Sequence, residues 1–515
     1  MSVKTHRKIA RNTLTNTLAY AVAFAANLII LPFVVHTLGN EVYGGIWIVI
    51  GTLTASLGLL DLGTGTAFVK YIAEYTTRRD DRSLSELVNT GIVMYTAIGI
   101  AILAAAWAIG GPILSLLGVP SALLDDGVFV FRVSVAIFVL ANVLSPVSMI
   151  LTGIQRMDLN ALIVMGGQLA GAGGTVFVLR SGWGVRGLII NNLAIVTVTA
   201  MVQCAVALHM VQGIRFARSY CRMTMAKRFL RFGMNLQVSK LAQVILFQTD
   251  RIVSLRMFGM VTATYYDVGA RLSSAARSSA MLSISALIPA AAELHAQDDR
   301  ARLLLLYKRG TKYTAIVATV TFGFITWFAS DVMRAWMGTE YLASVPIAIA
   351  LASGYFLNIS TGVASALAAG MGRTDYERTY GLFTALVNLP VTIGMAFFFG
   401  PIGIAIGTSM TLLFGGVYFL FQIHRFLGKP KGVLRDSLLR PLVASLFSGA
   451  IVFALREMFF GIPSARSGMI LLLVLLLLVF LIADGVLLLL LRVVGKEDLA
   501  TLRGLLRGEP QGEPA

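Results

Sequence analysis

The chain alternates between long apolar stretches and short polar segments. Each apolar stretch holds about 20 residues, the length at which an α-helix spans the hydrocarbon core of a bilayer. The polar segments between them are too short to fold as soluble domains. The pattern therefore predicts an all-α, polytopic membrane protein with fourteen transmembrane helices. The predicted spans are residues 14–37, 42–63, 87–109, 127–152, 159–180, 184–210, 233–255, 262–290, 312–329, 344–370, 378–399, 401–424, 441–460 and 468–491.

Composition agrees with a membrane protein and charge gives its orientation. The chain is 57% hydrophobic and only 13% charged, and its mean hydropathy is +0.81. Lys and Arg number 42 against 25 Asp and Glu, a formal net charge of +17. Most of these basic residues fall on one side of the membrane if the N-terminus is cytosolic, as the positive-inside rule requires. We therefore expect both termini in the cytosol, and we attribute the net charge to topology rather than to binding of nucleic acid.

Two sequence motifs recur in the two halves of the chain. "GIQRMD" at residues 153–158 returns as "GMGRTD" at residues 370–375, and "AEYTTRRDDR" at 73–82 returns as "AELHAQDDR" at 292–300. Six predicted spans separate the copies in each pair, so both copies have the same orientation in the membrane. Such a repeat is typical of transporters built from two lobes related by a pseudo-two-fold axis.

The repeat predicts the domain organisation. Residues 1–212 would form an N-lobe with spans 1 to 6, and residues 213–427 a C-lobe with spans 7 to 12. Residues 428–495 would hold the two C-terminal spans, and residues 496–515 a disordered cytosolic tail.

Charged side chains interrupt spans 7 and 8, where they are costly. A charge at membrane depth costs on the order of 3 kcal/mol on insertion scales, so it normally pairs or faces water. At 100° per residue, the polar side chains of span 7 fall on one half of the helix. On span 8, Asp267 and Arg271 begin a single polar stripe, and Arg277 lies close to it. The polar set of span 7 is Gln237, Lys240, Gln243, Gln248, Asp250 and Arg251.

Two interpretations of these charges are open. Asp250 with Arg271, and Asp267 with Arg251, could simply hold the two helices together as buried ion pairs. Lys240 and Arg277, however, have no carboxylate within a turn of their own span. Four cations against two carboxylates in spans 7 and 8 therefore favour a cavity that accepts an anion such as phosphate or carboxylate.

No pattern indicates an enzyme, a metal site or a cofactor. Cys204 and Cys221 lack the spacing of a metal site or a disulfide framework, and we find no catalytic constellation. Asp61 is expected to cap or bend the end of span 2. Asp484 and Arg132 have no assigned role.

Four segments together resemble a known transporter family. They are "TLGNEVYGGIWIV", "LDLGTGTAFVKYIAEY", "QTDRIVSLRMFG" and "LIPAAAELHAQDD". With the count of fourteen spans, they resemble the polysaccharide transporters of the multidrug, oligosaccharidyl-lipid and polysaccharide (MOP) exporter superfamily, the O-antigen flippase-like or Wzx-type proteins. The first lobe lacks the cavity arginines of lipid II flippases in that superfamily, which disfavours a lipid II role.

The resemblance implies a fold, a substrate and a site. Two six-helix lobes in a V shape, as in MATE and other MOP transporters, would enclose a cavity in the bacterial inner membrane. By alternating access, the protein would turn over an undecaprenyl-pyrophosphate-linked oligosaccharide for lipopolysaccharide or exopolysaccharide synthesis. Membrane lipids, a polysaccharide polymerase and glycosyltransferases would be its partners. Lys240, Arg251, Arg271 and Arg277 would hold the pyrophosphate, and Gln237, Gln243 and Gln248 the sugar hydroxyls, while Asp250 or Asp267 would couple an ion.

Two other functions remain open. A multidrug or small-solute antiporter of the same superfamily would show twelve spans and carboxylates in the first lobe, and the sequence predicts neither. A membrane-embedded glycosyltransferase or polysaccharide polymerase would show acidic or histidine-rich outer loops, and those loops are short here. The last two spans are interpreted either as a groove for a lipid tail or as plain lipid-facing helices.

Overall fold

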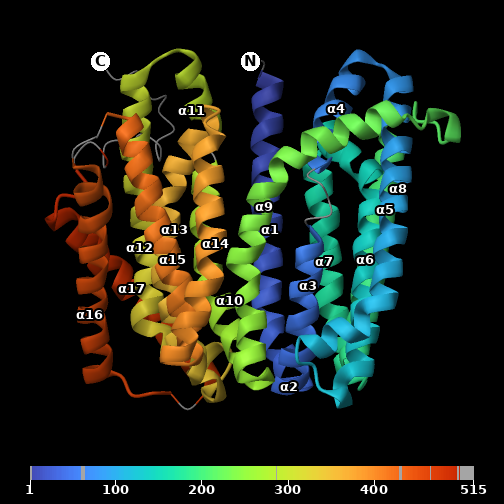
Figure 1. The fold of residues 1–515 in the computed structure, drawn as a ribbon. Coiled ribbons are helices and arrows are strands. Elements are labelled where there is room, and N and C mark those ends of the chain that lie inside the picture. Colours follow the sequence, from blue (N-terminus) through green and yellow to red (C-terminus); the bar gives the residue numbers. More distant parts are fainter. Residues whose placement is uncertain are drawn as a thin grey trace. The chain divides into compact units, whose positions relative to one another are not determined.

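The computed structural model describes residues 3–58, 64–285, 287–428, 432–463, 465–495 and 498, and these residues contain helices and no strand (Figure 1). Asp61 and nearly all of the predicted C-terminal tail lie outside them. The chain divides into two compact units, Met1–Thr264 and Tyr265–Ala515. The all-α membrane fold predicted from the sequence is confirmed.

Eleven helices within the described residues are long and apolar enough to cross a membrane. They correspond to all of the predicted spans except those at residues 42–63, 233–255 and 262–290. The last two are helical but carry the charged side chains of spans 7 and 8, and the first is divided among shorter elements. The total of fourteen spans therefore stays a prediction.

Unit 1 is an antiparallel helical assembly. Its long helices run side by side, and α5 with α6, α6 with α8, and α1 with α7 are closely packed pairs. A short π-helical turn, Tyr43–Ile48, joins α2 to α3. The helices are α1 (Val3–Leu38), α2 (Asn40–Val42), α3 (Val49–Leu57), α4 (Thr64–Arg78), α5 (Asp81–Leu116), α6 (Ser121–Gly153), α7 (Met157–Arg180), α8 (Gly184–Met210) and α9 (Met223–Phe258).

Glycines in the π-helical turn explain why α9 packs within unit 1. A Cβ on Gly44 would lie 2.1 Å from the carbonyl oxygen of Met260, and a Cβ on Gly45 would lie 2.4 Å from the Met260 sulfur. The Thr264 hydroxyl donates to the carbonyl of Asn40 at 2.7 Å. Only glycine permits this approach of two backbones, so the "YGG" stretch fixes the end of α9 and the start of α10 against α2 and α3. Unit 1 ends at Thr264, and the N-lobe boundary at residue 212 stays a prediction.

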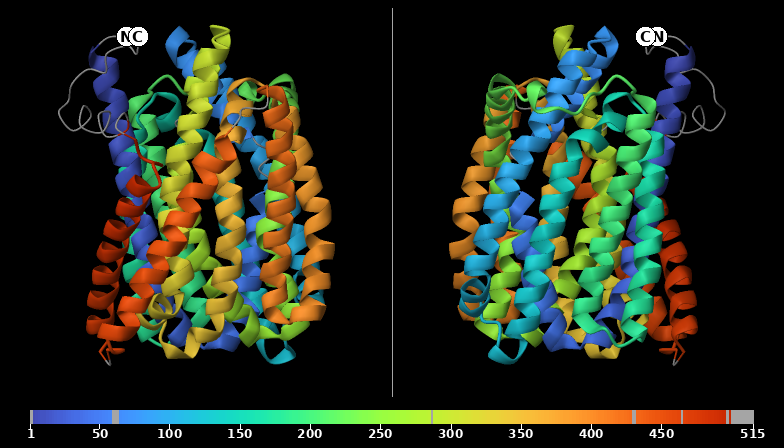
Figure 2. Two further views of the ribbon diagram at one scale, coloured as in Figure 1. Left: turned by 90° about the vertical axis from the view of Figure 1, so that its left-hand side faces the viewer. Right: turned by 90° about the vertical axis from the view of Figure 1, so that its right-hand side faces the viewer.

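Unit 2 holds the remaining helices, and α10 begins in the last residues of unit 1. Within unit 2, α14 packs on α15, and α13 lies against both α12 and α15 (Figure 2). The elements are α10 (Met260–Ser285), α11 (Leu287–Ala296), α12 (Arg300–Trp336), α13 (Val345–Gly370), α14 (Thr374–Phe399), α15 (Pro401–Phe426), α16 (Arg440–Phe459) and α17 (Arg466–Leu490).

The repeated motifs have the same local structure in both units. Asp80 accepts a hydrogen bond from the Ser83 N–H at 2.9 Å at the start of α5, and Asp299 accepts one from the Arg302 N–H at 2.9 Å at the start of α12. These are N-caps, and the hydrogen bonds from Ser83 lower the pKa of Asp80 from its ordinary value.

The second motif also repeats its backbone geometry. Gln155 and Gly372 occupy equivalent positions with φ of 59° and 72°. An Arg–Asp pair follows each of them, Arg156 with Asp158 at 3.1 Å and Arg373 with Asp375 at 3.2 Å. The sequence repeat is thus a repeat of local structure.

Helices α16 and α17 form a C-terminal hairpin that packs on α12. Arg456 of α16 contacts Asp331 of α12 at 2.7 Å, and both side chains are buried. Near the other end of α12, Lys312 contacts Asp498 at 2.6 Å. Burial alone would raise the pKa of Asp498, but hydrogen bonds from Lys312, Tyr313 and the Gly495 N–H outweigh it and hold the pKa below its usual value. The hairpin is therefore joined to α12 by polar contacts as well as by apolar packing.

Candidate functional site

Two charged residues of span 7, Asp250 and Arg251, lie in the last third of α9. Asp250 is only 4% exposed. Arg251 is half-buried and donates a hydrogen bond to the side-chain oxygen of Gln248 at 2.5 Å, one helical turn earlier. The structure therefore brings together Gln248 and Arg251, two of the predicted binding residues. Gln243 is exposed.

Two predicted binding residues cannot be described as side chains. Lys240 and Gln237 lie on α9 through their backbone, and their side chains fall outside the described residues. Their assignment to the site stays a prediction.

The charged residues of span 8 form an ion pair along α10. Arg271 Nε lies 2.6 Å from Asp267 Oδ2, at i and i+4 of the same helix, and the side chains are 39% and 1% exposed. Asp267 thus has a charged partner on its own helix. The Arg271 guanidinium is the more accessible end of the pair.

Arg277 lies in a polar network that joins three helices of unit 2. Its Nε donates to the side-chain oxygen of Asn358 on α13 at 3.0 Å, and the Asn358 amide donates to the Tyr380 hydroxyl on α14 at 3.2 Å. The guanidinium also lies 5.7 Å from the centre of the Tyr355 ring, a cation–π arrangement. Amide and aromatic groups of this kind hold a guanidinium in position without cancelling its charge.

A buried polar column continues from this network between α14 and α15. The Asn388 amide donates to the Thr408 hydroxyl at 3.2 Å, and Thr392 lies 3.4 Å from the same hydroxyl. All three residues are at most 1% exposed. The sequence interpretation missed Asn358, Tyr380 and this column, although the spacing of Thr384, Asn388 and Thr392 at i, i+4 and i+8 marks one face of a helix.

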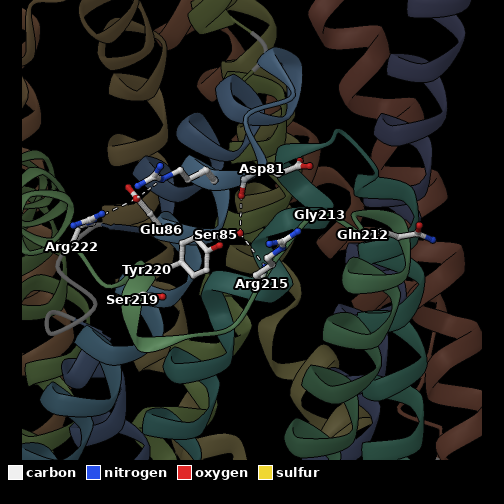
Figure 3. Close-up of a pocket in the computed structure, with 10 residues that line it drawn as sticks. Asp81, Ser85, Glu86, Gln212, Gly213, Arg215, Ser219, Tyr220 and Arg222 are labelled. Carbon is white, nitrogen blue, oxygen red and sulfur yellow. Dashed lines mark hydrogen bonds and ion pairs between the residues drawn. The ribbon is translucent and has the colours of Figure 1, made fainter.

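A separate polar pocket of about 510 Å³ lies where the start of α5 meets residues 211–222, which connect α8 to α9 (Figure 3). Its most buried acid, Glu86, lies 3.5 Å from Arg82 and 3.3 Å from Arg222. Asp81 and Arg215 also line it. Three bases (Arg82, Arg215 and Arg222) face two acids (Asp81 and Glu86), a smaller cationic excess than the four against two predicted for the binding site.

Side chains of α5 hold the connection between α8 and α9 in place. Asn89 donates to the carbonyl of Arg215 at 2.8 Å and accepts from the N–H of Ala217 at 3.2 Å. The hydroxyls of Ser85 and Thr90 accept from the N–H groups of Arg215 and Arg222. These bonds satisfy backbone groups of an irregular segment and so fix the point at which α9 begins.

We expect Asn89→Ala to loosen this connection. The change removes both hydrogen bonds between Asn89 and this connection and leaves backbone groups unsatisfied, a loss of about 1–3 kcal/mol. Trypsin should then cleave after Arg215 or Arg218 several-fold faster in the detergent-solubilised protein. Thr77→Ala is the control, because the Thr77 hydroxyl bonds only within α4 to the carbonyl of Ala73. Equal cleavage rates in the two variants would contradict the anchoring role of Asn89.

Arg132, which had no assigned role, is bound by the neighbouring helix α5. Its guanidinium donates to the carbonyl of Trp107 at 3.1 Å and lies 5.0 Å from the centre of the Trp107 ring. This arrangement gives Arg132 a structural role in the α5–α6 pair. Within the described residues, no group of three or more metal-ligating side chains is present.

Comparison with solved structures places the fold among transporters. Lipid II flippase MurJ in its inward closed conformation matches with a TM-score of 0.71 and 14% identity, over 93% of this chain and 98% of that one. An inward-facing multidrug resistance MATE family transporter of the MOP superfamily matches with a TM-score of 0.62 and 16% identity, over 83% and 95% of the chains. A MOP superfamily transporter from Pyrococcus furiosus matches with a TM-score of 0.58 and 16% identity, over 82% and 95%. At such identities the likeness concerns the fold.

A match to a protein-family model gives the family of the chain. No curated protein matched the chain in a sequence search. The model described as "Polysaccharide biosynthesis protein" matches residues 9–295, more than half of the chain, including most of α1, all of α2 to α10, and the charged residues of α9 and α10. The chain therefore belongs to the polysaccharide biosynthesis protein family and has the helical fold of MOP superfamily transporters.

Proposed function

We propose that the protein is a flippase that moves an undecaprenyl-pyrophosphate-linked oligosaccharide, the repeat unit of a polysaccharide, across the bacterial inner membrane. It works by alternating access through a cationic cavity, with both termini in the cytosol. The observation that carries this proposal is the set of three arginines, Arg251, Arg271 and Arg277, on the helices α9 and α10 of a polysaccharide-family transporter fold. Glycosyltransferases and a polymerase acting on the same glycan are its proposed partners, and no catalytic step is assigned to the chain itself.

The chemistry of the substrate matches these residues. Each polar group of an oligosaccharide that enters hydrocarbon without a partner costs several kcal/mol, so unassisted crossing is negligible. A pyrophosphate needs cations with several donors, and the guanidinium group supplies a planar set of them. Arg277 is held by an amide and an aromatic ring, and its attachment to Asn358 orients it in advance of substrate binding.

Translocation in proteoliposomes tests the proposal. Purified protein is reconstituted with a lipid-linked oligosaccharide whose glycan carries a fluorophore, and a membrane-impermeant quencher reports how fast the glycan changes leaflet. We expect the protein to raise this rate far above that of protein-free vesicles. A rate equal to that of empty vesicles, for correctly folded protein and a polyprenyl-pyrophosphate substrate, would contradict the proposal.

In the same assay, Arg277→Gln should slow translocation by about 10- to 100-fold. The change removes the positive charge proposed to bind the pyrophosphate but keeps an amide donor that can reach Asn358. A hydrogen bond to a charged group is worth about 1.5–3 kcal/mol, and the loss of one such bond corresponds to the expected fall in rate. Arg256→Gln is the matched control, because Arg256 lies exposed near the end of α9. An unchanged rate for Arg277→Gln would remove Arg277 from the site.

A small-molecule antiporter is the second candidate, favoured by the likeness of the fold to MATE transporters over 83% of the chain. Drug transport by the reconstituted protein, without movement of the lipid-linked glycan, would select it.

A further inference from the structure

The polar pocket at the start of α5 belongs to unit 1 and has no part in the proposed function. Three arginines line it. Arg82 lies in the first turn of α5, and Arg215 and Arg222 lie on the connection between α8 and α9 (Figure 3). Guanidinium groups that converge on one cavity are typical of a site for a phosphate or another oxyanion.

Buried side chains of α5 fix the backbone of two of these arginines. The Ser85 hydroxyl accepts from the Arg215 N–H at 3.0 Å, and the Thr90 hydroxyl accepts from the Arg222 N–H at 2.9 Å. Asn89 donates to the Arg215 carbonyl at 2.8 Å. The three side chains from α5 are at most 8% exposed. Both arginines therefore leave the connection at fixed points, and this lowers the entropic cost of binding a ligand.

Most hydrogen-bond donors of the three arginines are not used by the protein. Glu86 Oε1 accepts from Arg82 Nε at 3.5 Å and from Arg222 Nε at 3.3 Å. Among the described residues, no group accepts a hydrogen bond from the guanidinium of Arg215 or from the terminal nitrogens of Arg82 and Arg222. Because each guanidinium has five N–H donors, one shared carboxylate oxygen leaves most of them for a ligand.

The charges of the lining indicate what kind of anion fits. Three arginines face Asp81 and Glu86, which leaves a net charge of one. The Asp81 carboxylate is exposed and lies against Gly213, where a Cβ would come within 2.2 Å of the Asp81 Cγ. Uncharged polar side chains complete the lining: Gln212, Ser219 and Tyr220. A phosphodiester carries one negative charge, and hydroxyl groups attached to it can bond with the carboxylate and the uncharged side chains.

A lipid-facing stripe of α5 leads directly to the pocket. Residues seven apart lie on one face of a helix, and Glu86 begins such a series. Its later members are Val93, Ile100 and Trp107, and all three are exposed. Exposed apolar side chains along a helix of membrane length contact lipid. The pocket therefore lies where this lipid-facing surface ends.

Apolar side chains also accompany the arginines of the connection. Phe216 directly follows Arg215, and Met223 directly follows Arg222. They are 53% and 72% exposed. Exposed aromatic and apolar residues among arginines are typical of a segment that lies in the headgroup region of a membrane. A soluble phosphate compound would make no use of these side chains, whereas the acyl chains of a lipid would contact them.

We propose that this pocket binds the headgroup of a membrane glycerophospholipid that has one phosphodiester and free hydroxyls, as phosphatidylglycerol has. Arg215 and Arg222 donate to the phosphodiester, and Asp81 bonds with the headgroup hydroxyls. The acyl chains lie against Phe216 and the apolar stripe of α5. The bound lipid thereby ties the connection before α9 to the start of α5. The proposal does not depend on the identity of the transported molecule.

Binding of matched lipids to the purified full-length protein tests the pocket. Native mass spectrometry in detergent counts bound phosphatidylglycerol and phosphatidylcholine that have identical acyl chains. We expect phosphatidylglycerol to bind roughly 10-fold more tightly, and Arg215→Gln to weaken its binding about 5-fold, as cations near an anionic headgroup allow. Arg215→Gln should fold normally, because α5 holds the backbone of residue 215 and not its guanidinium.

Arg218→Gln is the matched control. Arg218 is exposed on the same connection but does not line the pocket, so this variant should bind phosphatidylglycerol as the wild type does. Equal affinity of the wild type for the two lipids would overturn the proposal. An equal loss in Arg215→Gln and Arg218→Gln would also overturn it, because it would show a diffuse attraction to anionic lipid.

Quenching in liposomes separates a membrane lipid from a soluble phosphate. Phe216→Cys carries a fluorophore in a chain whose two cysteines are replaced by alanine, and a spin label sits near the top of one acyl chain of either lipid. Labelled phosphatidylglycerol should quench more strongly than labelled phosphatidylcholine, and excess glycerol phosphate should not relieve the quenching. Equal quenching by the two lipids, or relief by glycerol phosphate, would contradict a lipid site.

Discussion

Arg271→Ala should abolish translocation and also destabilise the protein, and the two effects can be separated. Asp267 is 1% exposed and has Arg271 at 2.6 Å. Removing one partner of a buried ion pair destabilises a protein by about 3–5 kcal/mol. Because Arg271 is itself 39% exposed, we expect a loss near the lower end of that range. A bare loss of activity in this variant would therefore not distinguish binding from folding.

The double variant Asp267→Asn/Arg271→Gln makes that distinction. It removes both charges and keeps groups that can hydrogen-bond at i and i+4, so thermal stability in detergent should return to within a few degrees of the wild type. Translocation should stay at least 100-fold reduced, because the cation that binds the pyrophosphate is gone. Recovery of translocation together with stability would show that Arg271 serves only to neutralise Asp267.

Arg456→Ala should produce the largest loss of stability in the C-terminal hairpin. Arg456 and Asp331 are 8% and 4% exposed and lie 2.7 Å apart, and Arg456 also contacts Glu457. The variant leaves Asp331 buried without its cation, so the free energy of unfolding should fall by about 3–5 kcal/mol. Unfolding by denaturant in micelles, followed through a fluorophore on α17, measures this loss.

The control for Arg456 is an exposed pair at the other end of the same helix. Arg440 and Asp436 lie 3.1 Å apart but are 40% and 43% exposed. A pair of this kind contributes about 0–1 kcal/mol, so Arg440→Ala should change the free energy of unfolding only slightly. Equal losses in the two variants would contradict the view that burial makes Arg456 the anchor of the hairpin.

Much of the fold follows from local sequence patterns. The apolar stretches predicted the long helices, because a lipid-exposed helix needs an apolar surface along its whole length. The repeated motifs predicted equivalent turns, and Asp80 with Asp299 and Gln155 with Gly372 have matching geometry. Turn and cap geometry depends on neighbouring residues in the chain and can therefore be predicted from them.

The partners of the site residues could not be predicted in the same way. Asn358 is 81 residues from Arg277, and Asp331 is 125 residues from Arg456. Such contacts depend on which helices pack together and at what rotation, and a single sequence does not reveal this. The i, i+4 pair of Asp267 and Arg271 could be read from spacing alone, whereas the sequence left two ion pairs between the helices open beside a cavity that accepts an anion.

The contact between Gly44 and Met260 also depends on packing, since a Cβ on Gly44 would lie 2.1 Å from the Met260 carbonyl oxygen. The boundary near residue 212 that the repeat predicts for the N-lobe stays a prediction. Two glycines in a predicted span carry no obvious signal of such a contact. Their role becomes visible only when the opposing backbone is known.

Binding of two matched ligands to the purified protein tests the central claim most directly. One ligand is a glycan on a polyprenyl pyrophosphate, and the other is the same glycan on the uncharged polyprenyl alcohol. If guanidinium groups of α9 and α10 bind the headgroup, the pyrophosphate ligand should bind at least 100-fold more tightly, and Arg251→Gln/Arg277→Gln should erase most of that preference. Equal affinity for the two ligands in the wild type would contradict the account.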